Sequence, residues 1–204
     1  PQGSQVLLRN TAQALHERGH EVHLVVYGHG ENMTQDAFTV HRAMRVPGAN
    51  RVAAGPSWFK PFQDAALVAA LRRVVRKNRI EIVHAHNYEG LLVALAAGKR
   101  PIVYHAHNCM ADELPHFIGN SQGFGRWLDR TFPKKADHVI APHAALREYL
   151  VECGCDAARV TVIPPSVEVD AFPEPQFDDS LPPILYTGNL DRYQNLELLA
   201  HAMA

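Results

Sequence analysis

The chain has 204 residues, of which 47% are hydrophobic, and a formal net charge of −1. That length and composition suffice for the core of one domain and part of another. The near-zero charge argues against a nucleic-acid partner, which would need a basic surface, and no apolar run approaches the roughly 18 residues of a membrane span. Three cysteines are too few for a disulfide framework and indicate reduced thiols, so we expect a cytoplasmic protein.

The order of apolar and polar residues predicts an α/β domain over residues 1–169. The first periodic segment predicts a helix capped by Ser4 and stopped by Gly19. Predicted strands cover residues 21–27, 38–46, 80–86, 101–105, 138–141 and 160–163, and predicted helices cover 4–18, 61–77, 89–97, 124–132 and 144–152. Strands separated by helical stretches of about ten residues form βαβ units. We therefore expect a Rossmann-like open parallel sheet with helices on both faces.

A second domain is predicted to begin near the C-terminus. Residues 170–183 contain four prolines and four acidic residues, which is typical of a linker. In residues 184–204 an apolar run is followed by Gly188 and by an amphipathic pattern that starts at Leu196. This order predicts a strand, a glycine turn and a helix whose backbone N–H groups face an anion. We expect the second domain to be cut off at residue 204.

Polar residues gather where the predicted strands end. In open α/β sheets, ligands bind beyond the carboxyl ends of the strands. The strand-end clusters are residues 84–87, 105–108, 142–143, 164–168 and 188–191. They predict a ligand crevice that faces the second domain.

Six segments, in order along nearly the whole chain, resemble one known family. They are residues 3–5 with 18–22, 82–86, 101–108, 136–142, 160–168 with Phe172, and 185–190. Together they resemble the N-terminal domain of retaining glycosyltransferases of the GT-B fold, in family 4. The resemblance implies that the first strand of that domain precedes Pro1. It also implies that the donor-binding domain continues beyond Ala204.

The resemblance also implies a function. The whole protein is expected to transfer a hexose from a nucleotide-diphosphate sugar to a hydroxyl of a saccharide or lipid-linked acceptor, with retention and without a metal or other cofactor. In this fold, backbone amides and side-chain cations of both domains stabilise the leaving diphosphate. We expect the 204-residue chain alone to be inactive, because transfer requires closure of two domains over the donor.

Site residues follow from the same resemblance. Gly3 and Ser4 are expected to lie close to the donor diphosphate, although the family usually has a second glycine where Ser4 stands. His107 is expected beside the reacting sugar as the catalytic residue, and His86 in the acceptor-side cleft. The other expected substrate-binding residues are Asn108, Ser166, Glu168, Gly188, Asn189 and Arg192.

The chain departs from the family pattern at the second-domain turn. Uncharged Asn189 and Gln194 stand where the family has arginine and lysine, and Arg192 between them is a candidate replacement. Ser166 and Glu168 also differ from the usual glycine and aspartate. The alternative function is therefore a non-catalytic module that binds a saccharide or a partner protein. A nicotinamide-dependent oxidoreductase would need a Gly-x-Gly-x-x-Gly turn, which the sequence lacks.

Two His-Ala-His triplets, His84 with His86 and His105 with His107, pose the question of a metal site. Residues two apart on a strand share a face, so each pair could chelate zinc. No aspartate or cysteine stands at a supporting spacing, and we expect the histidines to line a substrate cleft or the core without binding a metal. Cys153 and Cys155 lack the spacing of a redox pair.

Residues 124–135 predict a basic amphipathic helix. Its aromatic side chains and its basic residues lie on different faces. The aromatic face is predicted to hold Phe124, Trp127, Leu128 and Phe132, and the basic face Arg126, Arg130 and Lys134. Such a helix either lies on an anionic membrane surface, here the inner membrane face, or packs its aromatic face on the core and exposes the basic one.

Overall fold

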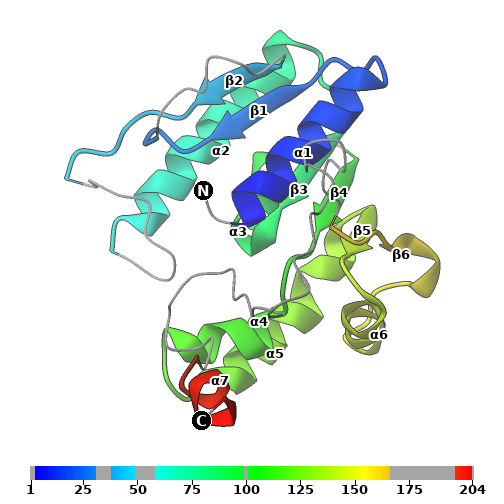
Figure 1. The fold of residues 1–204 in the computed structure, drawn as a ribbon. Helices are drawn as coiled ribbons and strands as arrows, with labels where there is room; N and C mark the ends of the chain where they lie inside the picture. Colours follow the sequence, from blue (N-terminus) through cyan, green and yellow to red (C-terminus); the bar gives the residue numbers. More distant parts are fainter. Residues whose placement is uncertain (1–2, 31–37, 49–57, 99–100, 166–195, 204) are drawn as a thin grey trace, which may run out of the picture. The chain divides into compact units, whose positions relative to one another are not determined.

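The computed structural model describes residues 3–30, 38–48, 58–98, 101–165 and 196–203 (Figure 1). The chain divides into two compact units, residues 1–166 and 167–204. In the second unit the structure describes α7 (Leu196–Ala202), at the position of the predicted C-terminal helix. The predicted linker, 170–183, and the predicted strand and glycine turn, 184–191, lie outside the described residues.

The strands of the first unit form two parallel sheets. β1 (His23–Val26) pairs with β2 (Thr39–Arg42). The second sheet has the order β3-β4-β5-β6 and contains β3 (Val83–His86), β4 (Ile102–His105), β5 (His138–Ala141) and β6 (Val160–Val162). The predicted parallel α/β class is confirmed. The described strands, however, form a two-stranded and a four-stranded sheet, because no backbone ladder joins β1 to β3 among them.

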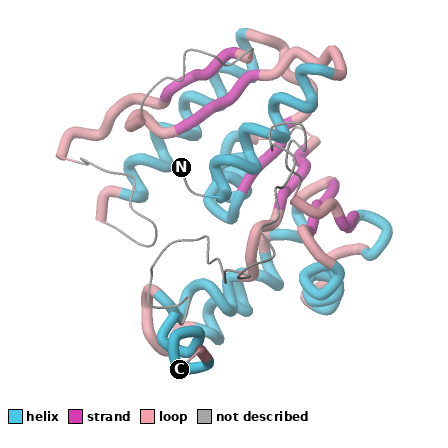
Figure 2. The backbone as a smooth tube through the Cα atoms, in the orientation of Figure 1, coloured by secondary structure: helices cyan, strands magenta, loops and turns pink. Residues whose placement is uncertain are grey.

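Helices connect and flank the strands (Figure 2). They are α1 (Gly3–Glu17), α2 (Lys60–Lys77), α3 (Asn87–Ala97), α4 (Met110–Glu113), α5 (Gln122–Thr131) and α6 (Ala144–Glu152), with short 3-10 helices η1 (Leu114–His116), η2 (Pro133–Lys135) and η3 (Ala157–Arg159). α2 packs on β1, β2 and α3, whereas α3 packs on β3 and β4 and α6 on β5 and β6. None of the described helices is long and apolar enough to span a membrane.

Two predicted details were wrong. α1 begins at Gly3, so Ser4 lies inside the first helical turn and is not the N-cap residue. The stretch 107–119, for which the sequence pattern predicts neither a helix nor a strand, contains α4 and η1. Both are local features that hydrophobic periodicity does not resolve, since α4 has only four residues.

The core of the second sheet explains which residues face the site. Ala85 and Tyr104 are paired in register and are buried on the same face of the sheet, in a cluster with Leu91 of α3. Side chains alternate between the faces of a strand. The histidines between these core positions, at 84, 86 and 105, therefore project from the opposite face.

Candidate functional site

Four histidines gather at the carboxyl ends of β3 and β4. His86 is the last residue of β3 and is in register with His105, the last residue of β4. His86 Nδ1 lies 3.3 Å from His107 Nε2, and the ring centroids of His86 and His105 are 4.8 Å apart. His84 and His105 stack with centroids 5.5 Å apart. The parallel pairing thus brings together His86 and His107, which are 21 positions apart in the sequence.

Burial keeps these imidazoles neutral. Burial first, and neighbouring histidines second, lower the pKa of His84 and of His107 to about 4, while the Glu89 carboxylate acts in the opposite direction on His107. Burial first, and the other three histidines second, lower the pKa of His86 to about 2. The pKa of His105 is also lowered by burial. At neutral pH each ring therefore offers one N–H donor and one nitrogen acceptor, which suits hydroxyl groups, and supplies no positive charge.

A tight turn at Asn87 connects the end of β3 to α3. Asn87, the first residue of α3, has φ 60°, a left-handed conformation that asparagine tolerates better than most residues. The strand therefore passes directly into α3 without a loop. His86 is held at the sheet edge, and Glu89 lies in the first turn of the following helix.

A second polar network lies beside the histidines. The Tyr27 hydroxyl donates to Asp64 Oδ1 at 2.6 Å, and Lys60 Nζ donates to the Tyr27 hydroxyl at 2.9 Å. Lys60 Nζ also lies 3.5 Å from Glu89 Oε1. The Glu89 carboxylate acts on the pKa of His107, which it raises against the larger effect of burial. The network thus joins the end of β1 to the starts of α2 and α3.

Sequence reasoning missed this network. Tyr27 follows β1 directly, so the strand-end rule applied to β1 would have found it. Lys60 and Asp64 carried no comparable signal, because their link to Tyr27 depends on the packing of α2 over β1.

The segment after β4 is positioned by α5. Asp129 of α5 is only 2% exposed, and its two carboxylate oxygens accept the backbone N–H groups of Met110 and Ala111, both at 2.9 Å. The Tyr149 hydroxyl donates to the same carboxylate at 3.0 Å. Gly125 permits the approach, since a Cβ there would lie 2.6 Å from the Met110 carbonyl carbon. These contacts hold the amino end of α4 in place and so fix the path of the chain just after His107.

Of the other predicted site residues, the structure describes some and not others. Asn108 is exposed after β4, and its side chain hydrogen-bonds to Glu113. Gly3 and Ser4 form the first turn of α1, and the N-terminus of a helix favours an anion. Five predicted residues lie outside the described part of the chain: Ser166, Glu168, Gly188, Asn189 and Arg192.

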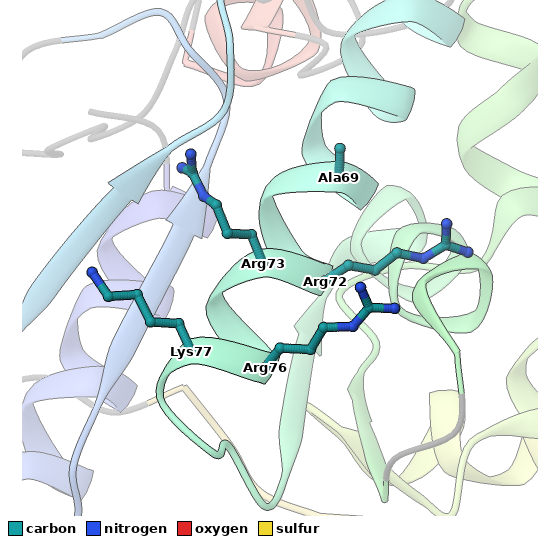
Figure 3. Close-up of a pocket in the computed structure, with 5 residues that line it drawn as sticks. All are labelled: Ala69, Arg72, Arg73, Arg76 and Lys77. Atoms are coloured by element: carbon teal, nitrogen blue, oxygen red, sulfur yellow. The ribbon is translucent and has the colours of Figure 1, made fainter.

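A basic hollow on α2 is not part of this edge. It is lined by Ala69, Arg72, Arg73, Arg76 and Lys77, and Figure 3 shows Arg73 and Lys77 pointing to one side of the helix and Arg72 and Arg76 to the other. Arg72 donates to the carbonyl oxygens of Ala96 at 2.6 Å and Ala97 at 3.1 Å, at the carboxyl end of α3. The histidines lie at the amino end of α3, so the hollow is at the opposite end of that helix. Its cations complement the dipole at the C-terminus of α2.

Comparisons with known proteins identify the family to which the chain belongs. Residues 1–171 match the family model of Glycosyltransferase Family 4. Among solved structures, HepE from Anabaena in complex with UDP-glucose has a TM-score of 0.55 and 21% identity, over 83% of this chain and 42% of that one. Sucrose-phosphate synthase from Thermosynechococcus elongatus has a TM-score of 0.79 and 17% identity, over 98% of this chain and 54% of that one.

The chain thus spans about two fifths of HepE and about half of sucrose-phosphate synthase. At these identities the two structures show the shared fold, which is that of GT-B glycosyltransferases. No curated protein sequence matches the chain. The family match covers most of the 204 residues, and the chain therefore belongs to glycosyltransferase family 4.

Proposed function

We propose that this chain is the acceptor-side domain of a retaining hexosyltransferase that uses a nucleotide-diphosphate sugar. Family membership supports transferase chemistry, and the similar HepE structure holds UDP-glucose. The observation that carries the proposal is the pairing of His107 with His86, 3.3 Å apart, at the carboxyl edge of the sheet. In this proposal His107 donates a hydrogen bond to a hydroxyl of the transferred sugar, and His86 contacts the acceptor.

The neutral state of His107 limits its role. With a pKa lowered to about 4 by burial, it cannot neutralise the departing diphosphate at neutral pH. In this proposal the charge of the diphosphate is stabilised by the N–H groups at the start of α1, near Gly3 and Ser4. Groups of the donor domain, namely Gly188, Asn189 and Arg192, stabilise it as well. The donor is bound as a substrate, and transfer proceeds without a metal at the diphosphate. Ser166, Glu168 and Asn108 complete the proposed substrate contacts.

The exposed aromatic side chains of α5 support contact with a membrane and a lipid-linked acceptor. Phe124 and Trp127 stack with ring centroids 5.5 Å apart and are 56% and 53% exposed. The buried positions of α5 are Gly125 and Asp129, so these two aromatic residues do not form the core-facing side of the helix. Aromatic rings beside basic residues suit the interface of an anionic bilayer. We place the enzyme in the cytoplasm, on the inner membrane face.

A donor survey tests the function. The parent protein that contains both domains is heated with UDP-, GDP- and ADP-sugars, with the 204-residue chain as the control. A raised midpoint for one nucleotide class in the parent, with turnover absent in the 204-residue chain, is the expected result. A folded parent that responds to none of the sugars would support the alternative, a non-catalytic saccharide- or partner-binding module, and would point to the uncharged Asn189 and Gln194 as the reason.

A further inference from the structure

Three histidines of the site form a compact set of nitrogen donors. One ring nitrogen from each of His84, His86 and His105 lies within 4.8 Å of the other two. The arrangement follows from the sheet: His84 and His86 share a face of β3, and His105 is the registered neighbour of His86 on β4. Rigid strands, not a loop, therefore position all three rings.

The hydrogen bonds of this set are incomplete. His105 is 4% exposed, and among the described residues neither of its ring nitrogens has a hydrogen-bond partner. His84 Nε2 is also buried without a partner in that part of the chain. A buried polar group left unpaired is destabilising, so three such atoms in one cluster call for a ligand. A group that accepts electron pairs from several nitrogens at once would satisfy them together.

The chemistry of the donors selects the ligand. The set contains only imidazole nitrogens, and imidazole suits zinc, copper and nickel, whereas magnesium, calcium and manganese prefer oxygen. Neutral imidazole is the form that binds metals. His86 is in addition hydrogen-bonded to His107, and a partner of this kind fixes the orientation of a ligating ring.

The distances are compatible with one ion. Zinc binds imidazole at about 2.0–2.1 Å, which places two nitrogens of a tetrahedral site about 3.3 Å apart. Nitrogens that lie within 4.8 Å of one another have to approach by up to about 1.5 Å to reach this spacing.

We propose that His84, His86 and His105 form a binding site for one divalent transition-metal ion of the zinc type. The site lies at the sheet edge next to His107 and leaves a fourth position open to water or a substrate oxygen. Its test needs neither donor nor acceptor. Its success or failure is therefore independent of the transferase proposal.

The test is a direct titration of the 204-residue chain, stripped with a chelator, with ZnCl₂ in competition with a chromophoric chelator. We expect one high-affinity ion per chain. His105→Gln and His84→Gln should each weaken binding by at least about 100-fold, since the loss of a ligand exceeds the 10–100-fold effect of losing its outer-shell partner. The matched control is His23→Gln, which breaks the other close histidine pair, His23 with His41 at 2.9 Å, and should leave the affinity unchanged.

A second measurement does not depend on how the variants fold. Co²⁺ added to the wild-type chain should give the intense visible bands of a four-coordinate site, at one equivalent. Absence of these bands together with absence of stoichiometric Zn²⁺ binding would overturn the proposal, and so would binding that is lost in His23→Gln but kept in a folded His105→Gln. In that case the cluster serves as a hydrogen-bonding surface for substrate hydroxyls.

Discussion

The Asp129 carboxylate of α5 accepts the backbone N–H of Ala111 in α4 at a distance of 2.9 Å. Asp129 thereby acts as the N-terminal cap of a helix from 18 positions away in the sequence, a task normally done by the residue just before the helix. The preceding residue here, Cys109, makes no side-chain cap. Since α4 follows His107 closely, this bond links the stability of α5 to the shape of the site.

Replacing Asp129 by Asn should destabilise the chain by about 1–3 kcal/mol. An amide offers one acceptor oxygen and one NH₂ group, so the N–H of Met110 or of Ala111 loses its partner in a buried place. The measurement is urea unfolding at neutral pH. Asp156→Asn is the control, because Asp156 also accepts a backbone N–H at a helix start but is exposed, and its loss should cost less. Equal effects of the two substitutions would contradict this account.

Gly125→Ala should destabilise the chain although alanine favours helices by about 1 kcal/mol over glycine. The new Cβ would press on the backbone of Met110 and Ala111, which cannot turn away as a side chain can. Gly123→Ala in the same helix is the matched control. A Cβ at Gly123 meets nothing within 4 Å, so the propensity gain should appear there as added stability. Unfolding midpoints that shift in the same direction for both variants would refute the close-approach argument.

Stability of the metal-free chain should fall as the pH is lowered from about 6.5 towards 4. Burial is the main cause that lowers the pKa of His84 and His107 to about 4, so the unfolded chain binds more protons than the folded one in this window. Stability is thus present above the unfolded-state pKa and is lost as the pH approaches the folded-state value. Glu89 opposes the effect at His107, and His105 adds to it at both.

The measurement is denaturant unfolding at several pH values with a chelator present. His107→Gln should make the dependence on pH shallower, because one titrating group is removed. His20→Gln, at an exposed position, should leave it unchanged. A slope that is the same in wild type and His107→Gln would show that His107 does not titrate below its ordinary range.

In the two-domain parent, His107→Ala should lower kcat by about 10²–10³-fold, the range for loss of one preorganised hydrogen-bond donor to the transition state. Donor protection against heat should change little, because the diphosphate is held elsewhere in this proposal. Steady-state kinetics with the donor found in the survey provide the check, and His138→Ala, an imidazole bonded to Thr161 on β6, is the control. Full activity in His107→Ala would show that His107 has no role in the transfer reaction.

Charge reversal on α5 and the adjoining η2 should abolish binding to anionic vesicles. The variant is Arg126, Arg130 and Lys134 changed together to Glu, and binding is measured by sedimentation with phosphatidylglycerol-containing and purely zwitterionic vesicles. The control reverses Arg73, Arg76 and Lys77, which are also exposed on a helix surface and change the net charge equally. Retained binding in the first variant would place the membrane contact elsewhere on the protein. Equal loss of binding in both variants would show that the contact is a non-specific effect of net charge.

The sequence alone determined the parallel α/β class and the place of His86 and His107 at strand ends. Both conclusions need only local periodicity and the rule that ligands meet the carboxyl ends of parallel strands. In the structure His86 of β3 is in register with His105 of β4. Because side chains alternate along each strand, both histidines lie on the same face of the sheet.

Tertiary structure alone decided the rest. α4 is too short to be stable by itself, and Asp129 holds its amino end from another helix. The bonds of Tyr27 to Asp64 and Lys60 span 37 and 33 positions, and the incomplete bonding of His105 appears only when its neighbours are in place. These features depend on which distant groups meet when the core packs, and a one-dimensional pattern of apolar and polar residues does not contain that information.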